Sequence, residues 1–248
     1  MSDVDDSIAA VPPPKGASKW EDYIDIFYAP SDVYARRINS GFGIPLLVVT
    51  VLVGAIFIAS SGALQPIMDA EFMRGMASAQ KANPNMTDAQ LQTAKSIGGT
   101  FAKIGAFVFM PITIFLTGLA LWVVGKFFDA KQTFGAALMV TAYANVIKVV
   151  ASIVMAVQLL LLDTSSMNGI LRLSLGVGRF LDPDTTSPLL IAMLGRVDVF
   201  TIWVTILLGI GLSVTGKIPR SKAMVAAAVV WFVGAMPGLL GALRQMGS

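Results

Sequence analysis

The sequence predicts an all-α, polytopic membrane protein with five transmembrane helices, an N-terminal interfacial helix and a helical outer loop. Of its 248 residues, 55% are apolar and 13% are charged, and the mean hydropathy is +0.74. In an ordinary soluble domain about 25% of residues are charged. Five apolar runs are each near or above the roughly 20 residues that cross a bilayer as a helix: about 43–64, 104–125, 134–162, 188–214 and 223–243.

The region before the first span has two parts. Residues 1–19 are acidic and then proline-rich, which predicts a disordered tail. An amphipathic helical pattern follows, whose apolar face carries Trp20, Tyr23, Ile24 and Phe27 and whose acidic face carries Glu21, Asp22 and Asp25. This pattern predicts a helix in the headgroup region, either as an anchor for the first span or as a partner-binding surface. No secretory cleavage pattern precedes it, so we expect the N-terminus to be retained.

The segment between the first two spans predicts a helical hairpin on the outer side of the membrane. Apolar residues at helical spacing line its first helix, including Met68, Phe72 and Met76. Thr87 and Gln90 form a capping-box pattern that starts its second helix. Farther along the chain, Ser187 followed by Pro188 predicts the start of the fourth span.

Two charged residues are predicted near the centre of the bilayer, where a charge costs roughly 3 kcal/mol on insertion scales. Lys148 lies near the middle of the third span, and Asp198 lies near the middle of the fourth. Because these spans run antiparallel, the two residues are expected at similar depth, which predicts an ion pair. Polar side chains share their helix faces, namely Asn145 beside Lys148, and Thr201 and Thr205 beside Asp198.

This polar pair has two interpretations. It fixes the register of two helices, or it marks the path of a proton or ion, as ionisable groups inside a bilayer often do. Arg196 lies off the face of Asp198, so we expect its side chain to reach outward or to meet another partner.

Glycine residues favour close packing of the fifth span. Gly234 and Gly238 form a GxxxG face, which predicts close helix packing within the chain, with a dimer contact as the alternative. Pro237 in this span and Pro111 in the second predict kinks.

The distribution of positive charge predicts the orientation. With the N-terminus inside, the inner segments hold nine Lys and Arg residues and the outer segments hold six. The two shortest loops are both basic and both inner, carrying Lys126 and Lys131 in one and Lys217, Arg220 and Lys222 in the other. Basic residues gather in cytoplasmic loops. We therefore expect a cytoplasmic N-terminus and an outer C-terminus, with the basic excess facing the lipid bilayer and no nucleic acid as partner.

The absence of two residue types narrows the chemistry. The chain has no cysteine and no histidine, which removes disulfides, zinc–thiolate sites, thiol nucleophiles and histidine-based triads. Asp198 is the only acidic residue well inside a span, so a pair of facing aspartates is excluded as well. We expect a protein that is not an enzyme, with no catalytic residue, cofactor or metal.

Three segments resemble the bacterial branch of the Yip domain family: "IFYAPSDVY" from residue 26, "TFGAALMVTAYANVIKVVAS" from residue 133, and "RVDVFTIWVTILLGIGLSVTGKIPRSKA" from residue 196. The residues that carry the resemblance are Phe27, Pro30, Tyr143, Asp198, Phe200, Trp203, Gly209 and Gly211. The resemblance implies a Yip-type membrane domain over residues 20–243, followed by a C-terminal tail at 244–248. It also implies five membrane helices with a cytoplasmic N-terminus. Eukaryotic relatives are associated with Rab-type GTPases and vesicle trafficking. The resemblance implies a Rab-type GTPase as partner of this chain by analogy alone.

Together these patterns predict an integral protein of a bacterial inner membrane that organises membrane or binds membrane partners, including copies of itself. The alternative is a small permease or ion-coupled transporter that uses Lys148 and Asp198.

Overall fold

The computed structural model describes residue 18, residues 20–82, residue 85, residues 87–164 and residues 167–246. Within these residues the chain is helical, and the one extended pairing is an isolated bridge between Gly176 and Asp198. Five helices are long and apolar enough to cross a membrane, which confirms the predicted all-α polytopic fold. The predicted disordered tail, residues 1–19, lies outside the described residues except for Ser18.

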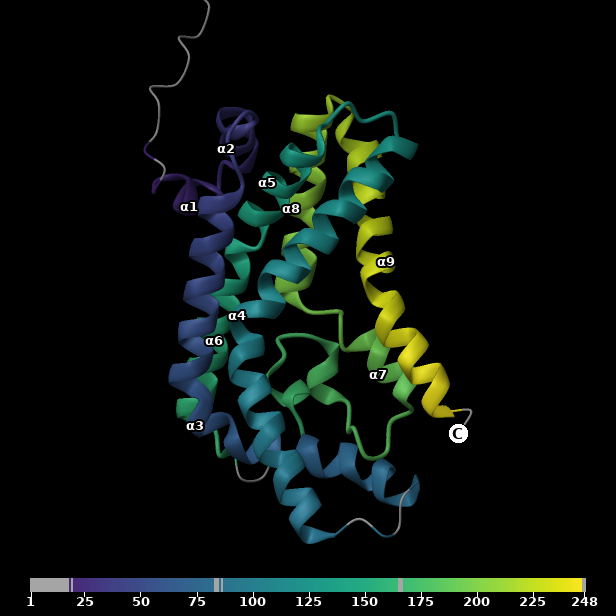
Figure 1. The fold of residues 1–248 in the computed structure, drawn as a ribbon. Coiled ribbons are helices and arrows are strands. Elements are labelled where there is room, and N and C mark those ends of the chain that lie inside the picture. The colour runs from purple at the N-terminus through teal and green to yellow at the C-terminus, as the bar shows by residue number, and fades with distance from the viewer. Residues whose placement is uncertain (1–17, 19, 83–84, 86, 165–166, 247–248) are drawn as a thin grey trace, which may run out of the picture.

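The bundle has two ends, which differ in what they carry (Figure 1). At one end lie α2 (Pro30–Arg37) and the connections between α4 and α5 and between α8 and α9; we call it the α2 end. The connection between α3 (Gly43–Ala82) and α4 (Asp88–Phe127) lies at the other end, which we call the hairpin end. The very short helix α1 (Asp22–Asp25) lies beside the upper end of α3.

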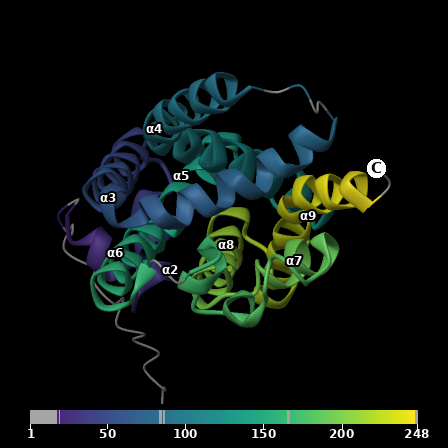
Figure 2. The same cartoon turned by 90° about the horizontal axis from the view of Figure 1, so that it is seen from below.

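The predicted hairpin is an extension of the first two spans rather than a separate unit. At 40 residues each, α3 and α4 are about 60 Å long, twice the roughly 30 Å thickness of the hydrocarbon core. Pro66 lies inside α3, and the second half of that helix runs across the hairpin end beneath the other helices (Figure 2). The predicted capping box is present, with Thr87 as N-cap and Gln90 donating and accepting the reciprocal hydrogen bonds.

The third span, Phe134–Leu161, has its first half in the centre of the bundle and its second half at the edge (Figure 2). It consists of α5 (Phe134–Ala144) and α6 (Val146–Leu161), which meet at Asn145. Every residue of α5 from Ala136 to Ala144 is buried. The amide of Asn145 is also buried and donates a 2.8 Å hydrogen bond to the carbonyl of Thr141, so this polar group is satisfied within its own helix.

The predicted continuous fourth span over 188–214 requires correction, because the chain forms two helices there. α7 (Pro188–Leu194) begins at the predicted Ser187 cap and ends at Gly195, and α8 (Val199–Gly216) begins after Asp198. α8 alone is about 27 Å long, which is close to the thickness of the hydrocarbon core. Asp198 therefore lies at a helix terminus and not in the middle of a span. Apolar residues on both sides of the break hide it from an analysis of hydropathy.

The remaining elements complete the hairpin end. Residues 167–187, which the structure describes without a gap, include two short 3₁₀ helices, η2 (Ile170–Leu173) and η3 (Val177–Phe180), and lie between the lower parts of α6 and α7 (Figure 1). The last helix, α9 (Arg220–Met246), continues beyond the predicted boundary at 243. Arg244 is therefore helical rather than part of a tail over 244–248, and residues 247–248 lie outside the described residues.

Candidate functional site

A buried carboxylate fixes the N-terminal segment to the bundle. Asp22 is 0% exposed. Its Oδ1 accepts a hydrogen bond from Nη2 of Arg36 at 2.8 Å, and its Oδ2 accepts one from Nε of Arg37 at 2.5 Å. The same Nη2 of Arg36 is 2.5 Å from Oδ2 of Asp25. Two carboxylates of α1 are thus bound by two guanidinium groups of α2, and charge-assisted hydrogen bonds of this kind are the strong ones. We call residues 20–37 the N-terminal clamp.

The clamp also sets the ionisation of its more exposed carboxyl group. Tyr28 donates a 2.5 Å hydrogen bond to Oδ1 of Asp25, and Arg36 binds the other oxygen. These two hydrogen bonds lower the pKa of Asp25 below its ordinary value, and the bond from Tyr28 has the larger effect. The hydrogen bond to Asp25 also raises the pKa of the Tyr28 phenol. The ion pair between Asp25 and Arg36 therefore persists at neutral and mildly acidic pH.

The acidic face predicted for Glu21, Asp22 and Asp25 does not stay together, because Asp22 is buried whereas Glu21 is exposed. Asp22 points into the bundle, because two arginines that lie beyond the turn at Pro30 surround its carboxylate. Tyr23 and Phe27 of the predicted apolar face pack against the core. Trp20 and Ile24 do not, although they belong to the same predicted face.

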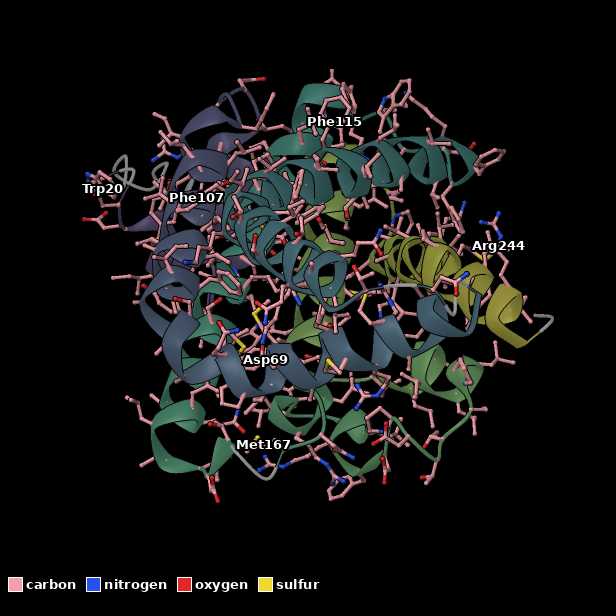
Figure 3. All side chains as sticks on the ribbon, turned by 60° about the horizontal axis from the view of Figure 1, so that its bottom comes forward. Trp20, Asp69, Phe107, Phe115, Met167 and Arg244 are labelled. Atoms are coloured by element: carbon pink, nitrogen blue, oxygen red, sulfur yellow. The ribbon has the colours of Figure 1, made fainter. Side chains whose placement is uncertain are left out.

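An apolar row faces away from the bundle instead. Trp20 is 69% exposed, Ile24 is 65% exposed and Tyr28 is 71% exposed, and their spacing of four residues places them on one side of the helical turns. Figure 3 shows Trp20 at the edge of the molecule. Trp20 also lines a cavity of 320 Å³ with Val48 and Leu52 of α3, so this end of the row lies beside the second and third turns of the first span.

Four of the residues that carry the sequence resemblance, Phe27, Tyr143, Trp203 and Gly211, lie on one seam between the clamp, α5 and α8. Tyr143 of α5 donates a 3.4 Å hydrogen bond to Oδ2 of Asp22, and its ring lies 5.8 Å from that of Tyr23. Phe27 and Trp203 make an edge-to-face contact with ring centroids 5.5 Å apart.

Two glycines of α8 allow neighbouring helices to approach closely, Gly211 on the side of the seam and Gly209 on the side of α9. A Cβ atom on Gly211 would lie 2.3 Å from Cγ1 of Val140 and 3.1 Å from Cε2 of Tyr34, and one on Gly209 would lie 2.6 Å from the sulfur of Met224. Phe200 packs against the same core, and Pro30 is the first residue of α2.

The second candidate site is the charged group at the break between α7 and α8. Asp198 is the N-cap of α8: its Oδ1 accepts hydrogen bonds from the backbone N–H groups of Phe200 at 2.9 Å and Thr201 at 3.1 Å, and its Oδ2 accepts one from the hydroxyl of Thr201. Thr205 Oγ1 donates to the carbonyl of Thr201 at 2.8 Å. The polar face predicted around Asp198 is therefore a capping network at the start of a helix.

The predicted ion pair between Lys148 and Asp198 is absent from the described part of the chain, although the two residues interact electrostatically. The physical reason is that the oxygens of Asp198 are committed to the cap of α8. Arg196 also lies near enough to act on the charge of Lys148. The site thus combines two cations with one carboxylate.

Residues 24–241 match the Yip1 domain. The chain belongs to the Yip1 family. The match covers the first four candidate spans, most of the fifth and the clamp from Ile24 onward. The chain is therefore an integral membrane protein of this family, which is not a known enzyme family. No curated protein and no solved structure matches the chain.

The partner of Arg196, which the sequence did not reveal, is Trp231 of α9, the fifth span of the Yip1 domain. The guanidinium carbon lies 5.8 Å from the ring centroid of Trp231, and Nη2 donates a 3.5 Å hydrogen bond to the carbonyl of the same residue. A Cβ atom on Gly234 would lie 3.2 Å from that Nη2, and one on Gly238 would lie 4.0 Å from Cβ of Ala192. Gly234 thus approaches Arg196 at the break, and Gly238 approaches α7, while both glycines remain exposed. Close packing of the GxxxG face and a dimer contact through it both stay predictions.

Sequence reasoning missed the cluster of Asp22, Arg36 and Arg37. A signal was present, since acidic residues before a proline turn and two arginines after it can meet when the chain reverses direction. Helical periodicity alone hid it, because that method assigns every charge to the solvent face.

Proposed function

We propose that this Yip1-family protein organises membrane by holding a rigid apolar wedge in the headgroup region of one leaflet. The observation that carries the proposal is the pairing of buried Asp22 with Arg36 and Arg37, which fixes the clamp while Trp20 and Tyr28 remain on its outer side. In the orientation favoured by positive charge, this leaflet is the cytoplasmic one of a bacterial inner membrane.

The position of the apolar row supports a contact with lipid. Val48, which lines a cavity with Trp20, lies about 8 Å along α3 from Gly43. Helices in the membrane interface bury their apolar face by about 5–10 Å, and tryptophan and tyrosine gather at that depth. Because the clamp is preformed, insertion needs no folding on binding, which otherwise reduces affinity.

A wedge that expands one leaflet favours membranes in which that leaflet is convex, as the outer leaflet of a small vesicle is. The test reconstitutes the protein into liposomes of mixed size and measures its density in small and large vesicles. The chain has no cysteine, so Ser18→Cys supplies a single label that reports the orientation through a membrane-impermeant maleimide. We expect enrichment in small vesicles with the α2 end outside, and loss of that enrichment in the triple variant Trp20→Ser, Ile24→Ser, Tyr28→Ser.

The matched control removes three equally exposed apolar side chains from the hairpin end: Leu160→Ser, Leu161→Ser and Phe180→Ser, which are 82%, 77% and 82% exposed. This variant is expected to keep the enrichment. Equal density of the parent in both vesicle sizes, or equal loss in the two triple variants, would overturn the proposal.

One specific observation favours the alternative function, a permease or ion-coupled transporter. Many transporters bind their substrate where a membrane helix is discontinuous, and the break between α7 and α8 lies beside Lys148, Arg196 and Asp198. Its test is proton uptake into sealed liposomes under a pH gradient, with Lys148→Met as the variant. Uptake by the parent that Lys148→Met abolishes would establish transport, and the absence of uptake by the folded parent would dismiss it.

A further inference from the structure

A large cavity opens between the two longest helices at the hairpin end, far from the clamp. It has a volume of 1040 Å³ and is bounded by α3 and α4, with Met155 of α6 and Ile170 of η2 completing its wall. Pockets that hold small ligands measure about 300–1,000 Å³, so this cavity is at the top of that range. Figure 3 shows Asp69, one of its lining residues, on the part of α3 that crosses the hairpin end. We call it the hairpin cavity.

The depth of the hairpin cavity spans the boundary between hydrocarbon and headgroups. Phe57 lies about 21 Å along α3 from Gly43, whereas Asp69 lies about 39 Å along it. On the partner helix, Lys103 lies about 36 Å from Phe127. With a hydrocarbon core about 30 Å thick, Phe57 is inside that core, and both charged residues are at the level of the headgroups.

The lining changes from apolar to polar in the same direction. Its apolar part belongs to a small buried cluster that includes Leu64, Ile67 and the packed side chains of Phe57, Met68 and Met155. Its polar part includes Gln65, Asp69, Gln92, Lys95 and Lys103. A ligand that fits both parts has a hydrocarbon chain and a polar head, as a phospholipid does.

The charged residues of the lining indicate which kind of headgroup the hairpin cavity binds. Asp69 is paired with Lys95 at 2.9 Å, and Glu71 is paired with Arg74 at 2.9 Å and also accepts a hydrogen bond from the backbone N–H of Ile170. Lys103 has no ion pair in the described part of the chain. The four charged residues that line the hairpin cavity, Asp69, Glu71, Lys95 and Lys103, balance one another in number. Lys103 is the one of them without an ion pair among the described residues, so it is the cation available to a phosphate group at the headgroup level.

Two features show that the space is open to the bilayer and unfilled by the protein. A Cβ atom on Gly98 or Gly99 of α4 would meet nothing within 4 Å, so no other side chain occupies the space beside this turn. Large apolar side chains next to the cavity on the same helices are exposed, among them Ile58, Phe101 and Ile104. In a membrane protein such side chains face lipid, so the medium beside the opening is a lipid leaflet.

We propose that the hairpin cavity binds a phospholipid with an anionic headgroup from the adjacent leaflet. Its phosphate lies at Lys103, and an acyl chain lies along Phe57, Leu64 and Met155. This site is separate from the wedge proposed above, because it involves the opposite leaflet and none of the clamp residues.

The test measures which lipid remains bound when the purified protein is released from detergent micelles that contain equal amounts of phosphatidylglycerol and phosphatidylcholine, using native mass spectrometry. We expect the parent to retain phosphatidylglycerol about fivefold more than phosphatidylcholine, the effect of one basic residue at an anionic surface. Lys103→Ala should reduce this ratio to about one. Gly99→Leu, which places a side chain in the open space, should reduce retention of both lipids.

The matched control is Lys131→Ala, which removes the same charge from an exposed position at the α2 end, and it should keep the parent ratio. Unchanged melting of each variant in lipid-free detergent shows that the fold is intact. Equal retention of the two lipids by the parent, an equal fall of the ratio in Lys131→Ala, or full retention in Gly99→Leu would each overturn the proposal. If Gly99→Leu fails to fold, Lys103→Glu takes its place. A retention ratio that stays near fivefold in Lys103→Glu would also overturn the proposal.

Discussion

Tyr143 donates its phenolic hydrogen bond to the carboxylate of Asp22, although 121 residues separate them in the chain. Tyr143 belongs to α5, which is buried from Ala136 to Ala144, and Asp22 belongs to the clamp. The contact therefore fastens the clamp to the most buried helix of the Yip1 domain and not only to neighbouring residues. A clamp attached in this way keeps a fixed position relative to the first span.

The ion pairs of Asp22 are expected to stabilise the fold substantially. In Asp22→Asn the guanidinium groups of Arg36 and Arg37 lose their buried counter-charge, and breaking a buried ion pair costs about 3–5 kcal/mol. Both arginine side chains are partly exposed, so we expect about 3 kcal/mol, the lower end of that range. The free energy of unfolding in mixed detergent–SDS micelles measures it.

The control for this prediction is Asp32→Asn, the same change at an exposed carboxylate of α2. Exposed substitutions away from special features alter stability by about 0.5 kcal/mol or less. Similar free energies of unfolding for the two variants would show that the pairing of Asp22 contributes little.

The ion pair of Asp25 gives the clamp a defined response to acid. Because the hydrogen bond from Tyr28 and that from Arg36 lower the folded pKa of Asp25 below its ordinary value of 3.8, the folded state favours the ionised carboxylate. This stabilisation is fully present above the unfolded pKa and is lost as the pH falls through the folded pKa. We expect the difference in unfolding free energy between the parent and Asp25→Asn to be constant from pH 7 to 5 and to shrink below pH of about 4. A difference that is already lost at pH 6 would contradict this assignment.

The seam between α5 and α8 depends on the missing side chain of Gly211. In Gly211→Ala the new Cβ atom would lie 2.3 Å from Cγ1 of Val140, a distance that forces one of two buried helices to move. Overpacking of this kind costs about 1–3 kcal/mol. The double variant Gly211→Ala, Val140→Ala should recover part of the loss because it removes the clashing methyl groups. Gly241→Ala, whose Cβ atom meets nothing within 4 Å, is the control and should be neutral or slightly stabilising.

The sequence was sufficient for the features that depend on local composition. The presence of five apolar segments, the reciprocal hydrogen bonds of Thr87 and Gln90, and the cap at Ser187 depend on nearby residues, and each was predicted. The bounds of the fourth span were not. The break at Asp198 was not predicted, since the residues around it are apolar on both sides and hydropathy averages over them.

Features that depend on the relative placement of helices could not be predicted from the sequence. The burial of Asp22 needs the chain to reverse at Pro30 and α5 to supply Tyr143. The hairpin cavity needs α3 and α4 to leave an unfilled space between them beside Gly99. Neither arrangement leaves a periodic pattern in one segment, and periodicity is the signal that sequence reasoning uses.

The role of Asp198 as a cap leads to a prediction that separates the capping role from a pairing role. If the residue acted mainly as a counter-charge for Lys148, exchanging the two by Lys148→Asp and Asp198→Lys would restore stability lost in each single variant. A lysine cannot accept the hydrogen bonds that the N–H groups of Phe200 and Thr201 donate, so we expect the exchanged variant to remain as unstable as Asp198→Lys alone.

The conservative variants give the same distinction without a charge reversal. Asparagine caps helices about as well as aspartate, whereas alanine at this position costs about 0.5–2 kcal/mol. We therefore expect Asp198→Asn to unfold nearly as the parent does and Asp198→Ala to be less stable by about 1 kcal/mol in mixed micelles. Equal destabilisation by asparagine and alanine would show that the charge matters more than the cap, because both variants lose the charge and only alanine loses the acceptor. The break between α7 and α8 would then be maintained by the electrostatic attraction between Asp198 and Lys148.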